Sequence, residues 1–547
     1  MPIAADTTKR SVMLAMLPYL LVAVFAWVGY FNSLDVPFTF DDESNIGKNQ
    51  SVLITDLSPG SLAQAAFGSS HPTPRPVAYL TFGLNHYFGQ LDVVGYHIVN
   101  IVIHTINGWL VFVLALHLCP LLIRRTKEAP RSVHVLFALA VALIFISHPV
   151  QTQAVTYIVQ RMTSLCTLFY LAGLLCYIRG RCIEASVIRL RAVWWSLAFV
   201  CWVLAIGTKQ FAVTLPLAIM LYEWVARGEQ FKIQKKTIAA IGGGAVLMLL
   251  AVVVFKGGVL SNKGTLTELL TSGYDNRDFT LTERLMTESR VVMHYISLLV
   301  WPPPSRLVLI YDYPISTSLV TPFSTILSIL GLGAMTVASA VFARRLPLVA
   351  FGVLWFMLHL AVESTIIPLE IAYEHRLYMP LIGAGLLFVG GVFALIKNPK
   401  AAFALVFVIS AVMLVGTHQR NETWRSALGI WEDNAKKQPT EFRAFFNMAV
   451  IHKDDGRYTE AIDLLQQTIE LEPRHQEAMV RAGALLKLSG RYQESANAYT
   501  AAIAFDRDEH PRFAACSIGK PPVIFRGGYC FCSQAVLLWP KVSPHRD

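Results

Sequence analysis

The chain has 547 residues, of which 54% are hydrophobic and only 15% are charged, and its mean hydropathy is +0.49. Because soluble domains average about a quarter charged residues, this composition excludes an ordinary soluble protein and requires that much of the chain faces lipid. The net charge of +10 fits a membrane protein whose Lys and Arg residues gather in cytoplasmic connections, so we expect no nucleic-acid partner.

Apolar segments that can cross a bilayer as helices, about 20 residues each, follow one another along most of the chain. The first comes after Lys9 and Arg10. It is long for the apolar part of a signal peptide and no small-residue cleavage site follows it, so we interpret it as an uncleaved helix. In chain order we expect about eleven spans, near residues 11–33, 95–118, 133–148, 154–178, 192–208, 211–226, 237–256, 322–343, 347–364, 379–396 and 401–417.

The connections between these spans alternate in charge. Since Lys and Arg mark cytoplasmic connections, the alternation predicts a cytoplasmic N-terminus and an extracytoplasmic C-terminal region. The basic connections hold Arg124, Arg125, Lys127 and Arg131; Arg179, Arg181, Arg189 and Arg191; Arg227, Lys232, Lys235 and Lys236; Arg344 and Arg345; and Lys397 and Lys400. The outward regions then lie near 34–94, 257–321 and 363–378, and the stretch from His294 to Trp301 is a candidate half-buried or re-entrant segment.

Residues beyond about 419 lose the apolar runs and begin to repeat. Gly456-Arg457-Tyr458 recurs as Gly490-Arg491-Tyr492, and Pro439 recurs as Pro473, an offset of about 34 residues that is the tetratricopeptide period. We expect a short α-solenoid over 419–507, made of a half repeat and two full repeats. Such repeats bind partner proteins in a concave groove, and a purely structural role is the alternative.

The last segment, 508–547, has no repeat register. Its Cys530-Phe531-Cys532 spacing is too tight for a common zinc site and lacks a second pair of ligands. We interpret the segment as a divergent, disordered or out-of-frame tail and assign it no function. The fold class expected for the whole chain is all-α, with a polytopic membrane domain over 1–418 followed by the repeats and this tail, and no metal site is predicted.

Ionisable side chains gather at the outer ends of the predicted spans. Carboxylates at a membrane interface can act as a general base or bind a cation, and outward-facing cations can bind a lipid phosphate. The alternatives are a solvated acidic loop and cations that extend to the interface. The candidates are Asp41, Asp42, His148, Arg161, Lys209, His375 and Arg376. His97 and His104, two turns apart on the second span, are further candidates, with helix-packing hydrogen bonds as the alternative.

Ordered motifs carry a family resemblance over nearly the whole chain, to about residue 507. They are FDDESNIGKNQ, RPVAYLTFGLNHYFGQLDVVGYHIVNIVIHTING, HPVQTQAVTYIVQRMTSL, WPPPSRLVLIYDYP, YEHRLYMP and WRSALGIWEDNAKKQP. Together they resemble the transmembrane-and-tetratricopeptide-repeat protein family, whose eukaryotic members are protein O-mannosyltransferases of the endoplasmic reticulum. The style of HPVQTQAVTYIVQRM resembles bacterial members, which implies a bacterial inner membrane as the location.

The resemblance implies a glycosyltransferase of the C superfamily (GT-C), which uses a sugar linked to polyprenyl phosphate, a membrane lipid. It implies transfer of that sugar to a Ser or Thr hydroxyl of a protein recruited by the repeats. Asp41 is then expected to be the base that activates the acceptor hydroxyl, with Asp42 positioning it. Arg161, Lys209, His375 and Arg376 are expected to contact the donor phosphate. Whether a divalent cation takes part is left open.

Two other classes of protein remain as alternatives. A non-catalytic membrane-anchored scaffold would bind envelope proteins through its repeats, and replacement of Asp41 and Asp42 would then be harmless. A transporter would carry broken helices and charged groups near the bilayer midplane, whereas here the polar groups concentrate at the outer ends of the spans. The transporter is therefore the weaker of the two.

Overall fold

The computed structural model describes residues 3–69, 74–122, 130–184, 186–226, 274 and 277–509, and within these ranges it contains helices and no strand. The chain divides into two compact units, one that ends at Ile430 and one that begins at Trp431. The predicted end of the membrane domain, at residue 418, falls inside the last long helix of the first unit.

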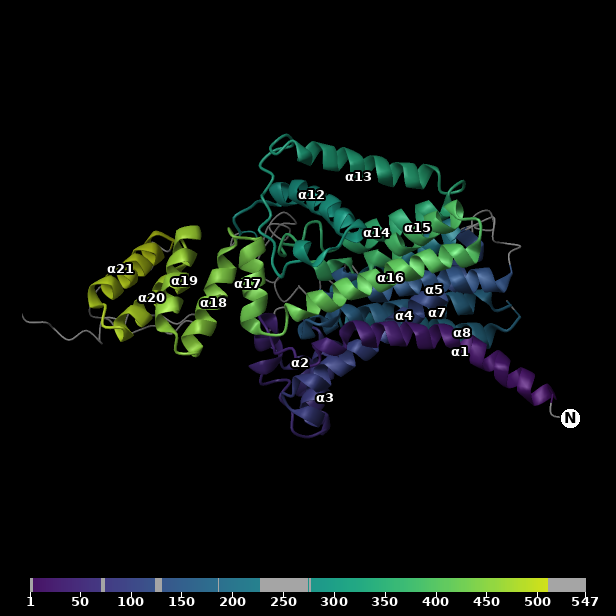
Figure 1. The fold of residues 1–547 in the computed structure, drawn as a ribbon, viewed down its shortest axis with the longest axis horizontal. Coiled ribbons are helices and arrows are strands. Elements are labelled where there is room, and N and C mark those ends of the chain that lie inside the picture. The colour runs from purple at the N-terminus through teal and green to yellow at the C-terminus, as the bar shows by residue number, and fades with distance from the viewer. Residues whose placement is uncertain are drawn as a thin grey trace, which may run out of the picture. The chain divides into compact units, whose positions relative to one another are not determined.

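In the first unit, long helices run side by side and are joined by loops and shorter helices (Figure 1). The long helices are α1 (Ile3–Tyr30), α4 (Val93–Leu122), α5 (Arg131–Ser147), α7 (Arg161–Cys182), α8 (Ile188–Ile206), α12 (Leu281–Val300), α13 (Ser324–Val341), α14 (Pro347–Leu360), α15 (Pro380–Leu395) and α16 (Pro399–Glu422). The shorter helices are η1 (Phe31–Ser33), η2 (Glu43–Gly47), α2 (Pro59–Phe67), α3 (Pro76–Gly89), η4 (Pro149–Gln151), α6 (Thr152–Val155), η5 (Ile158–Gln160), η6 (Gln210–Thr214), α9 (Leu215–Leu221), η7 (Tyr222–Ala226), η9 (Pro304–Arg306) and η10 (Glu374–Leu377).

Six of the described helices are long and apolar enough to cross a membrane, namely α1, α4, α7, α8, α13 and α16. The segment from α5 through α6, bent by 53°, is a seventh candidate, and α14, α15 and Gln210–Val225 are shorter apolar helices. Every predicted span corresponds to one of these, except the one near 237–256, which lies outside the described residues. The structure confirms an all-α membrane bundle, whereas the predicted count of about eleven spans is not confirmed.

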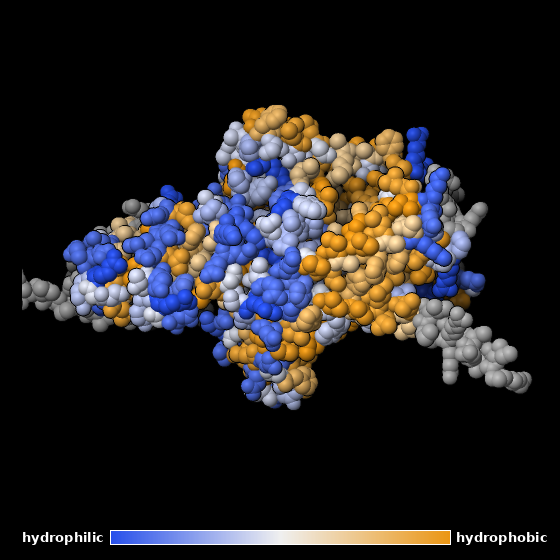
Figure 2. All heavy atoms as spheres, in the orientation of Figure 1, coloured by the Kyte–Doolittle hydropathy of each residue, from blue (hydrophilic) through white to orange (hydrophobic). Residues whose placement is uncertain are grey.

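The surface of the bundle fits a bilayer. Figure 2 shows an apolar band over the flanks of the long helices, with hydrophilic residues beyond both of its ends. The exposed large apolar side chains on α1 and α16 include Leu20, Val24, Val408, Val412 and Val415. Because helices satisfy their own backbone hydrogen bonds, they can expose such side chains to lipid without an unpaired polar group.

Close packing inside the bundle depends on a small residue at one crossing. A Cβ atom at Gly108 of α4 would lie 2.6 Å from Cδ1 of Ile146 and 2.7 Å from Cγ1 of Val22. Glycine therefore allows α4 to approach both α5 and α1, as small residues do at membrane helix contacts.

The fourth predicted span, near 154–178, begins later than expected, at Arg161. After α5 the chain bends at His148, and Pro149, which has no N–H to donate, cannot extend the helix. Residues 149–160 instead form η4, α6 and η5, and this bent segment is almost entirely buried. It carries Gln153 and Tyr157 into the polar end of the bundle.

Two of the predicted outward regions contain folded elements rather than simple loops. The region near 34–94 holds η2, α2 and α3, and the region near 257–321 holds α12, while residues 257–273 lie outside the described part of the chain. The stretch from His294 to Trp301 forms the last two turns of α12 and its C-cap. This helix begins with a capping box in which Thr280 and Glu283 satisfy each other's backbone N–H.

The second unit consists of helical hairpins, and α17 (Ala427–Lys437) crosses the boundary into it. Its helices are α18 (Phe442–Asp454), α19 (Tyr458–Leu471), α20 (Gln476–Leu488) and α21 (Tyr492–Glu509). Gly456 and Gly490 follow α18 and α20 with φ of +78° and +76°, the left-handed conformation in which glycine ends a helix. The equivalent turns confirm the repeats predicted from the sequence, while residues 510–547, with Cys516, Cys530 and Cys532, lie outside the described range.

Candidate active site

Asp42 is held in place by hydrogen bonds in the loop that follows α1. Its side chain is buried, and its carboxylate accepts hydrogen bonds from the backbone N–H groups of Thr39 at 3.0 Å and Val159 at 2.6 Å. Burial raises the pKa of Asp42, and the two amide donors act in the opposite direction. Because both carboxylate oxygens are occupied, Asp42 joins this loop to the turn before α7.

Asp41, its neighbour, is only partly buried and lies against the hydroxyl of Tyr157. The backbone N–H of Asp41 donates to that hydroxyl at 2.9 Å, and the hydroxyl in turn hydrogen-bonds the Asp41 carboxylate. Burial raises the pKa of Asp41, while Tyr157 and the positive charge of Arg75 oppose the shift. The ring of Tyr157 packs on Trp424, with ring centroids 5.4 Å apart, so the end of α16 supports the tyrosine that holds Asp41.

Lys209, between α8 and η6, forms a buried ion pair with Glu363, which follows α14. Its Nζ lies 2.9 Å from Oε1 of Glu363 and donates to Oγ1 of Thr163 at 3.0 Å. Burial by itself would raise the pKa of Glu363, but the charges of Lys209 and Arg376 reverse the effect and lower it. The pair is therefore charged on both sides despite its burial.

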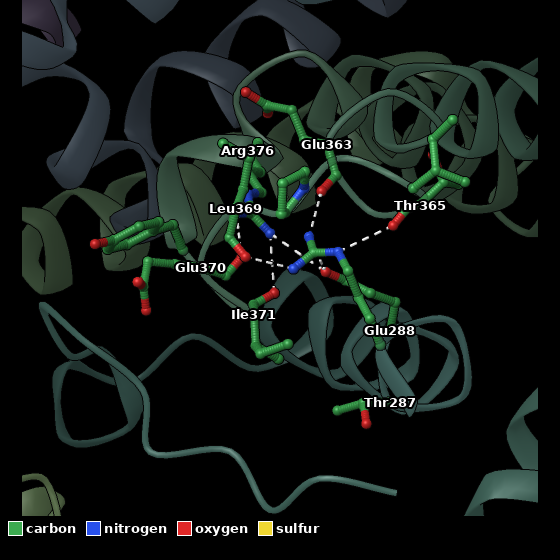
Figure 3. A network of polar contacts seen from close by, with 12 residues as sticks. Thr287, Glu288, Glu363, Thr365, Leu369, Glu370, Ile371 and Arg376 are labelled. Atoms are coloured by element: carbon green, nitrogen blue, oxygen red, sulfur yellow. Dashed lines mark hydrogen bonds and ion pairs between the residues drawn. The ribbon is translucent and has the colours of Figure 1, made fainter. Parts of the chain in front are cut away.

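Arg376, on η10, is held by α12 and by its own loop. Its Nη1 donates to the carbonyl of Ile371 at 2.9 Å, its Nη2 to the carbonyl of Glu370 at 2.5 Å, and Nη1 lies 3.7 Å from Oε1 of Glu288. The same Glu288 oxygen lies 2.7 Å from Nη2 of Arg284. One buried carboxylate thus faces two arginines (Figure 3).

Arg284 also organises the backbone of the segment after α14. Its guanidinium donates to the carbonyls of Glu363 at 3.0 Å, Thr365 at 2.9 Å and Leu369. Of these three residues Glu363 is buried, and a buried carbonyl left without a donor is costly. Through this arginine, α12 sets the position of the loop that carries both Glu363 and Arg376.

His375 lies beside these cations. Its Nδ1 is 2.9 Å from Oε1 of Gln153, which also accepts the backbone N–H of His375 at 2.8 Å, and its ring stacks on Tyr373. Burial and the charges of Lys209, Arg376 and Arg75 lower the pKa of His375 well below its usual value. The ring is therefore neutral, and with Nδ1 donating to Gln153, Nε2 is left as an acceptor.

These side chains form one group, which we call the charged cluster and define as Asp41, Arg75, Lys209, Glu363, His375 and Arg376. Electrostatic interactions connect its members, which come from four separate parts of the chain. Of the predicted residues, Asp41, Lys209, His375 and Arg376 are brought together, and Asp42 lies next to them. Among the described residues, no group of three His, Cys, Asp or Glu side chains is placed to hold a metal ion.

Arg161 does not point its guanidinium into the charged cluster. It is fully buried and donates to Oδ1 of Asn100 at 2.6 Å, to Oδ1 of Asn85 at 2.6 Å and to the carbonyl of Tyr96 at 2.9 Å. These contacts connect α7 to α3 and α4. In this structure Arg161 therefore has a packing role.

The three candidate histidines hold separate segments of the fold together through hydrogen bonds. Nε2 of His97 lies 2.9 Å from the carbonyl of Val36, and Nδ1 of His104 lies 2.7 Å from the hydroxyl of Tyr378. Nε2 of His148 lies 3.2 Å from the carbonyl of Leu299. His104 also contacts the carbonyl of Ile146 on α5, which is a helix-packing contact, whereas His97 connects α4 to the loop after η1. None of the three histidines is part of the charged cluster.

Sequence reasoning missed Arg75, Tyr157, Arg284 and Glu288. A signal existed for the last two, because they are four residues apart and share a helical face with Val291, Val292 and Tyr295. A charged pair on the buried stripe of an amphipathic helix is unusual. No comparable local signal distinguishes Arg75 or Tyr157 from other polar residues of their segments.

An apolar groove lies next to the charged cluster. It has a volume of about 580 Å³ and runs between α14 and the helical segment that follows Lys209. Its lining consists of Leu217, Met220, Leu221, Trp224, Leu354, Met357, Leu358 and Ala361. Ala361 of this lining is two residues before Glu363 in the chain, which places the groove near the ion pair.

The fold and the cluster define a polytopic helical membrane protein with a buried charged site at one end of its bundle and a separate tetratricopeptide-repeat unit. A family model described as "Tetratricopeptide repeat" matches residues 453–516. The chain is 26% identical to the Drosophila melanogaster "Protein O-mannosyl-transferase Tmtc3" over 89% of its own length and 59% of that relative. It is 23% identical to "Protein O-mannosyl-transferase F38B6.6" of Caenorhabditis elegans over 84% of this chain and 63% of the relative.

Over a shorter stretch, 36% of this chain and 21% of the relative, the identity to human "Protein O-mannosyl-transferase TMTC3" is 30%. No solved structure matches the chain. The chain is thus a relative of the transmembrane-and-tetratricopeptide-repeat proteins named protein O-mannosyl-transferases, as its motifs predicted. It spans less than two thirds of the length of the Drosophila and Caenorhabditis relatives.

Proposed function

We propose that the protein is a GT-C glycosyltransferase that transfers a sugar from a polyprenyl-phosphate-linked donor to Ser or Thr hydroxyls of proteins. The observation that carries this proposal is the charged cluster, in which a partly buried carboxylate, Asp41, lies among cations beside an apolar groove. The relatives named protein O-mannosyl-transferases support a protein acceptor and make mannose the first sugar to test.

The proposed reaction is a single displacement at the anomeric carbon. Asp41 takes the proton of the acceptor hydroxyl, and the hydroxyl oxygen forms a bond to the anomeric carbon. The bond from that carbon to the phosphate oxygen breaks, and polyprenyl phosphate leaves with the electron pair. Lys209 and Arg376 stabilise the negative charge that develops on the phosphate.

Asp42 and His375 support this reaction without contacting the phosphate. Asp42 fixes the backbone that presents Asp41, since its own oxygens are taken by Thr39 and Val159. The neutral ring of His375 offers Nε2 as an acceptor, which suits a sugar or acceptor hydroxyl better than an anion. The role first expected for His375 at the phosphate is therefore replaced by a hydroxyl contact.

The apolar groove is the proposed binding site of the polyprenyl chain. Its lining is aliphatic and aromatic, and Ala361 of that lining is two residues before Glu363, the partner of Lys209. A lipid tail along α14 would bring its phosphate head to the cations of the cluster while the tail stays in an apolar environment.

We place the cluster and the repeats on the extracytoplasmic side of a bacterial inner membrane, with the N-terminus in the cytoplasm. The support is the alternation of basic connections in the sequence. Part of these connections, including Arg124, Arg125 and Lys127 and the run from Arg227 to Lys236, lies outside the described residues. In this arrangement the repeats recruit the acceptor protein on the side where the chemistry occurs.

The experiment that tests the function compares extracytoplasmic glycopeptides in a null strain complemented with wild-type protein or with Asp41→Asn. Loss of specific glycopeptides is expected with the variant, because removal of a general base costs about 10²- to 10⁴-fold in rate. The matched control is Glu43→Gln, which removes an exposed carboxylate paired with Lys48 in the same loop. Identical glycoproteomes for wild type and Asp41→Asn at equal membrane abundance would disprove the catalytic assignment.

The alternative is a non-catalytic scaffold that assembles envelope proteins, for which the tetratricopeptide unit is the supporting observation. That alternative predicts that Asp41→Asn complements fully, while substitutions in the repeats do not. The same set of complemented strains therefore separates the two functions.

A further inference from the structure

The cations of the bundle's polar end differ in whether a protein group already holds them. Lys209 is paired with Glu363, and Arg376 is held by two carbonyls and by Glu288 (Figure 3). Arg161 donates hydrogen bonds to Asn100, Asn85 and Tyr96. Each of these cations keeps a protein partner whether or not a ligand is present.

Arg75 is the exception. Among the described residues, its one hydrogen-bond contact is from Nη1 to Sδ of Met162 at 2.8 Å, and a thioether is a weak acceptor. Its Nε is buried and has no hydrogen-bond partner in the described part of the chain. The Arg75 side chain is half-buried, and a guanidinium partly withdrawn from water gains from a strong acceptor, so an anion that binds there would complete its contacts.

The backbone holds Arg75 next to Lys209. Arg75 is the N-cap of α3, with φ of −133° and ψ of 59°, and Pro76 occupies the first position of the helix. The N–H of Val77 donates to the carbonyl of Gly207 at 3.0 Å, two residues before Lys209. One main-chain hydrogen bond therefore connects the start of α3 to the turn that carries the second cation.

The charges around Arg75 define what kind of ligand fits. The carboxylates of Asp41 and Glu363 both act on Arg75, and Arg75 in turn acts on Lys209 and His375. Glu363 is already paired with Lys209, and Asp41 is hydrogen-bonded to Tyr157. A phosphate group would supply the acceptor that Arg75 lacks, between the proposed base and the Lys209–Glu363 pair.

We propose that Arg75 is the primary contact for the phosphate of the lipid-linked donor, with Lys209 and Arg376 supplying the surrounding positive field. This inference rests on the proposed function for the identity of the ligand. Arg75 uses its guanidinium to bind phosphate oxygens through two parallel hydrogen bonds, a geometry that lysine cannot reproduce.

The test measures binding of farnesyl phosphate to the full-length protein in detergent, with farnesol and inorganic phosphate as separate probes. Arg75→Met is expected to weaken farnesyl phosphate binding by about tenfold or more, the size of one charge-assisted contact, and Arg75→Lys by less. Binding of farnesol, which lacks the phosphate, should be unchanged in both variants. The matched control is Arg290→Met, because Arg290 is an arginine on α12 that donates to the carbonyl of Pro314 outside the cluster.

Inorganic phosphate, used as a competitor of farnesyl phosphate, tests whether Arg75 binds the phosphate headgroup. Competition by phosphate alone in the wild type, lost in Arg75→Met, supports the assignment. Equal affinities of wild type and Arg75→Met for farnesyl phosphate, or no saturable binding by the wild type, would overturn it. If the wild type binds farnesyl phosphate through Arg75 but transfers no sugar, the glycosyltransferase proposal fails while the phosphate site stands.

Discussion

Ion pairs occur in both compact units, but they lie in opposite environments. In the first unit, the side chains of Arg284 and Glu288 are 0% and 2% exposed. In the repeat unit, those of Arg481 and Glu477 are 35% and 57% exposed. Both are i,i+4 pairs on a helix, so sequence spacing is the same and burial is the difference.

Burial changes what an ion pair does. An exposed pair gains little because water screens it, and its loss is tolerated. A buried pair has given up hydration, so removal of one partner leaves an uncompensated charge. The repeat unit therefore uses charge for a soluble surface, whereas the bundle uses charge to fix a loop at a site, where every member depends on the others.

The largest effect is expected at Glu288. Glu288→Ala leaves Arg284 and Arg376 facing each other without an anion and should lower the free energy of unfolding by about 3–5 kcal/mol. Thermal unfolding of the purified full chain measures this, with the exposed α12 residue Glu283→Gln as control. A shift as small as that of the control would mean that the Arg284–Glu288–Arg376 contacts carry no stability.

The next effect concerns the Lys209–Glu363 pair. Lys209→Met should destabilise the protein, and adding Glu363→Gln should restore stability, with a coupling of about 1–3 kcal/mol. Sugar transfer should stay low in the double variant, since the positive charge is still missing. Recovery of activity together with stability would show that Lys209 acts only as the partner of Glu363.

A smaller effect is expected in the pH dependence of transfer. Burial raises the pKa of Asp41, and a base is active only when deprotonated, so the rate should fall as pH drops through a value above the ordinary carboxyl range near about 4. In the exposed repeat pair, Arg491 instead lowers the pKa of Glu494 through a hydrogen bond. A rate that stays constant from neutral pH down to about 4 would contradict the assignment of Asp41 as base.

The smallest effect is expected in the repeats. Arg481→Gln should change the free energy of unfolding of the repeat unit by less than about 1 kcal/mol and leave sugar transfer intact. Loss of acceptor glycosylation at unchanged stability would instead identify Arg481 as part of the surface that recruits the acceptor.

Most of the fold could be predicted from the sequence because its signals are local. Apolar length marked the spans, and the 34-residue offset marked turns such as those at Gly456 and Gly490. The fourth span begins at Arg161 rather than near 154, because the residues before it form the short helices α6 and η5 instead of one continuous helix. The interpretation of 257–321 as an outer region did not include α12, whose buried face carries Arg284 and Glu288.

The candidate site was predictable only in part. The sequence by itself determined the class of fold, the repeat unit, the motifs that hold Asp41, Asp42, His375 and Arg376, and the outer turn that holds Lys209. These features follow from the composition, the periodicity and the order of residues along the chain. Only the tertiary structure decided which charges meet.

The packing of α3, α7, α12 and α14 pairs Lys209 with Glu363, occupies Arg161 and Arg376 with protein acceptors, and leaves Arg75 with a sulfur atom as its hydrogen-bond contact. These groups are far apart in the chain, and the cost of burying a charge depends on the atoms around it. Such atoms are set by helix packing, which no local pattern in the sequence specifies.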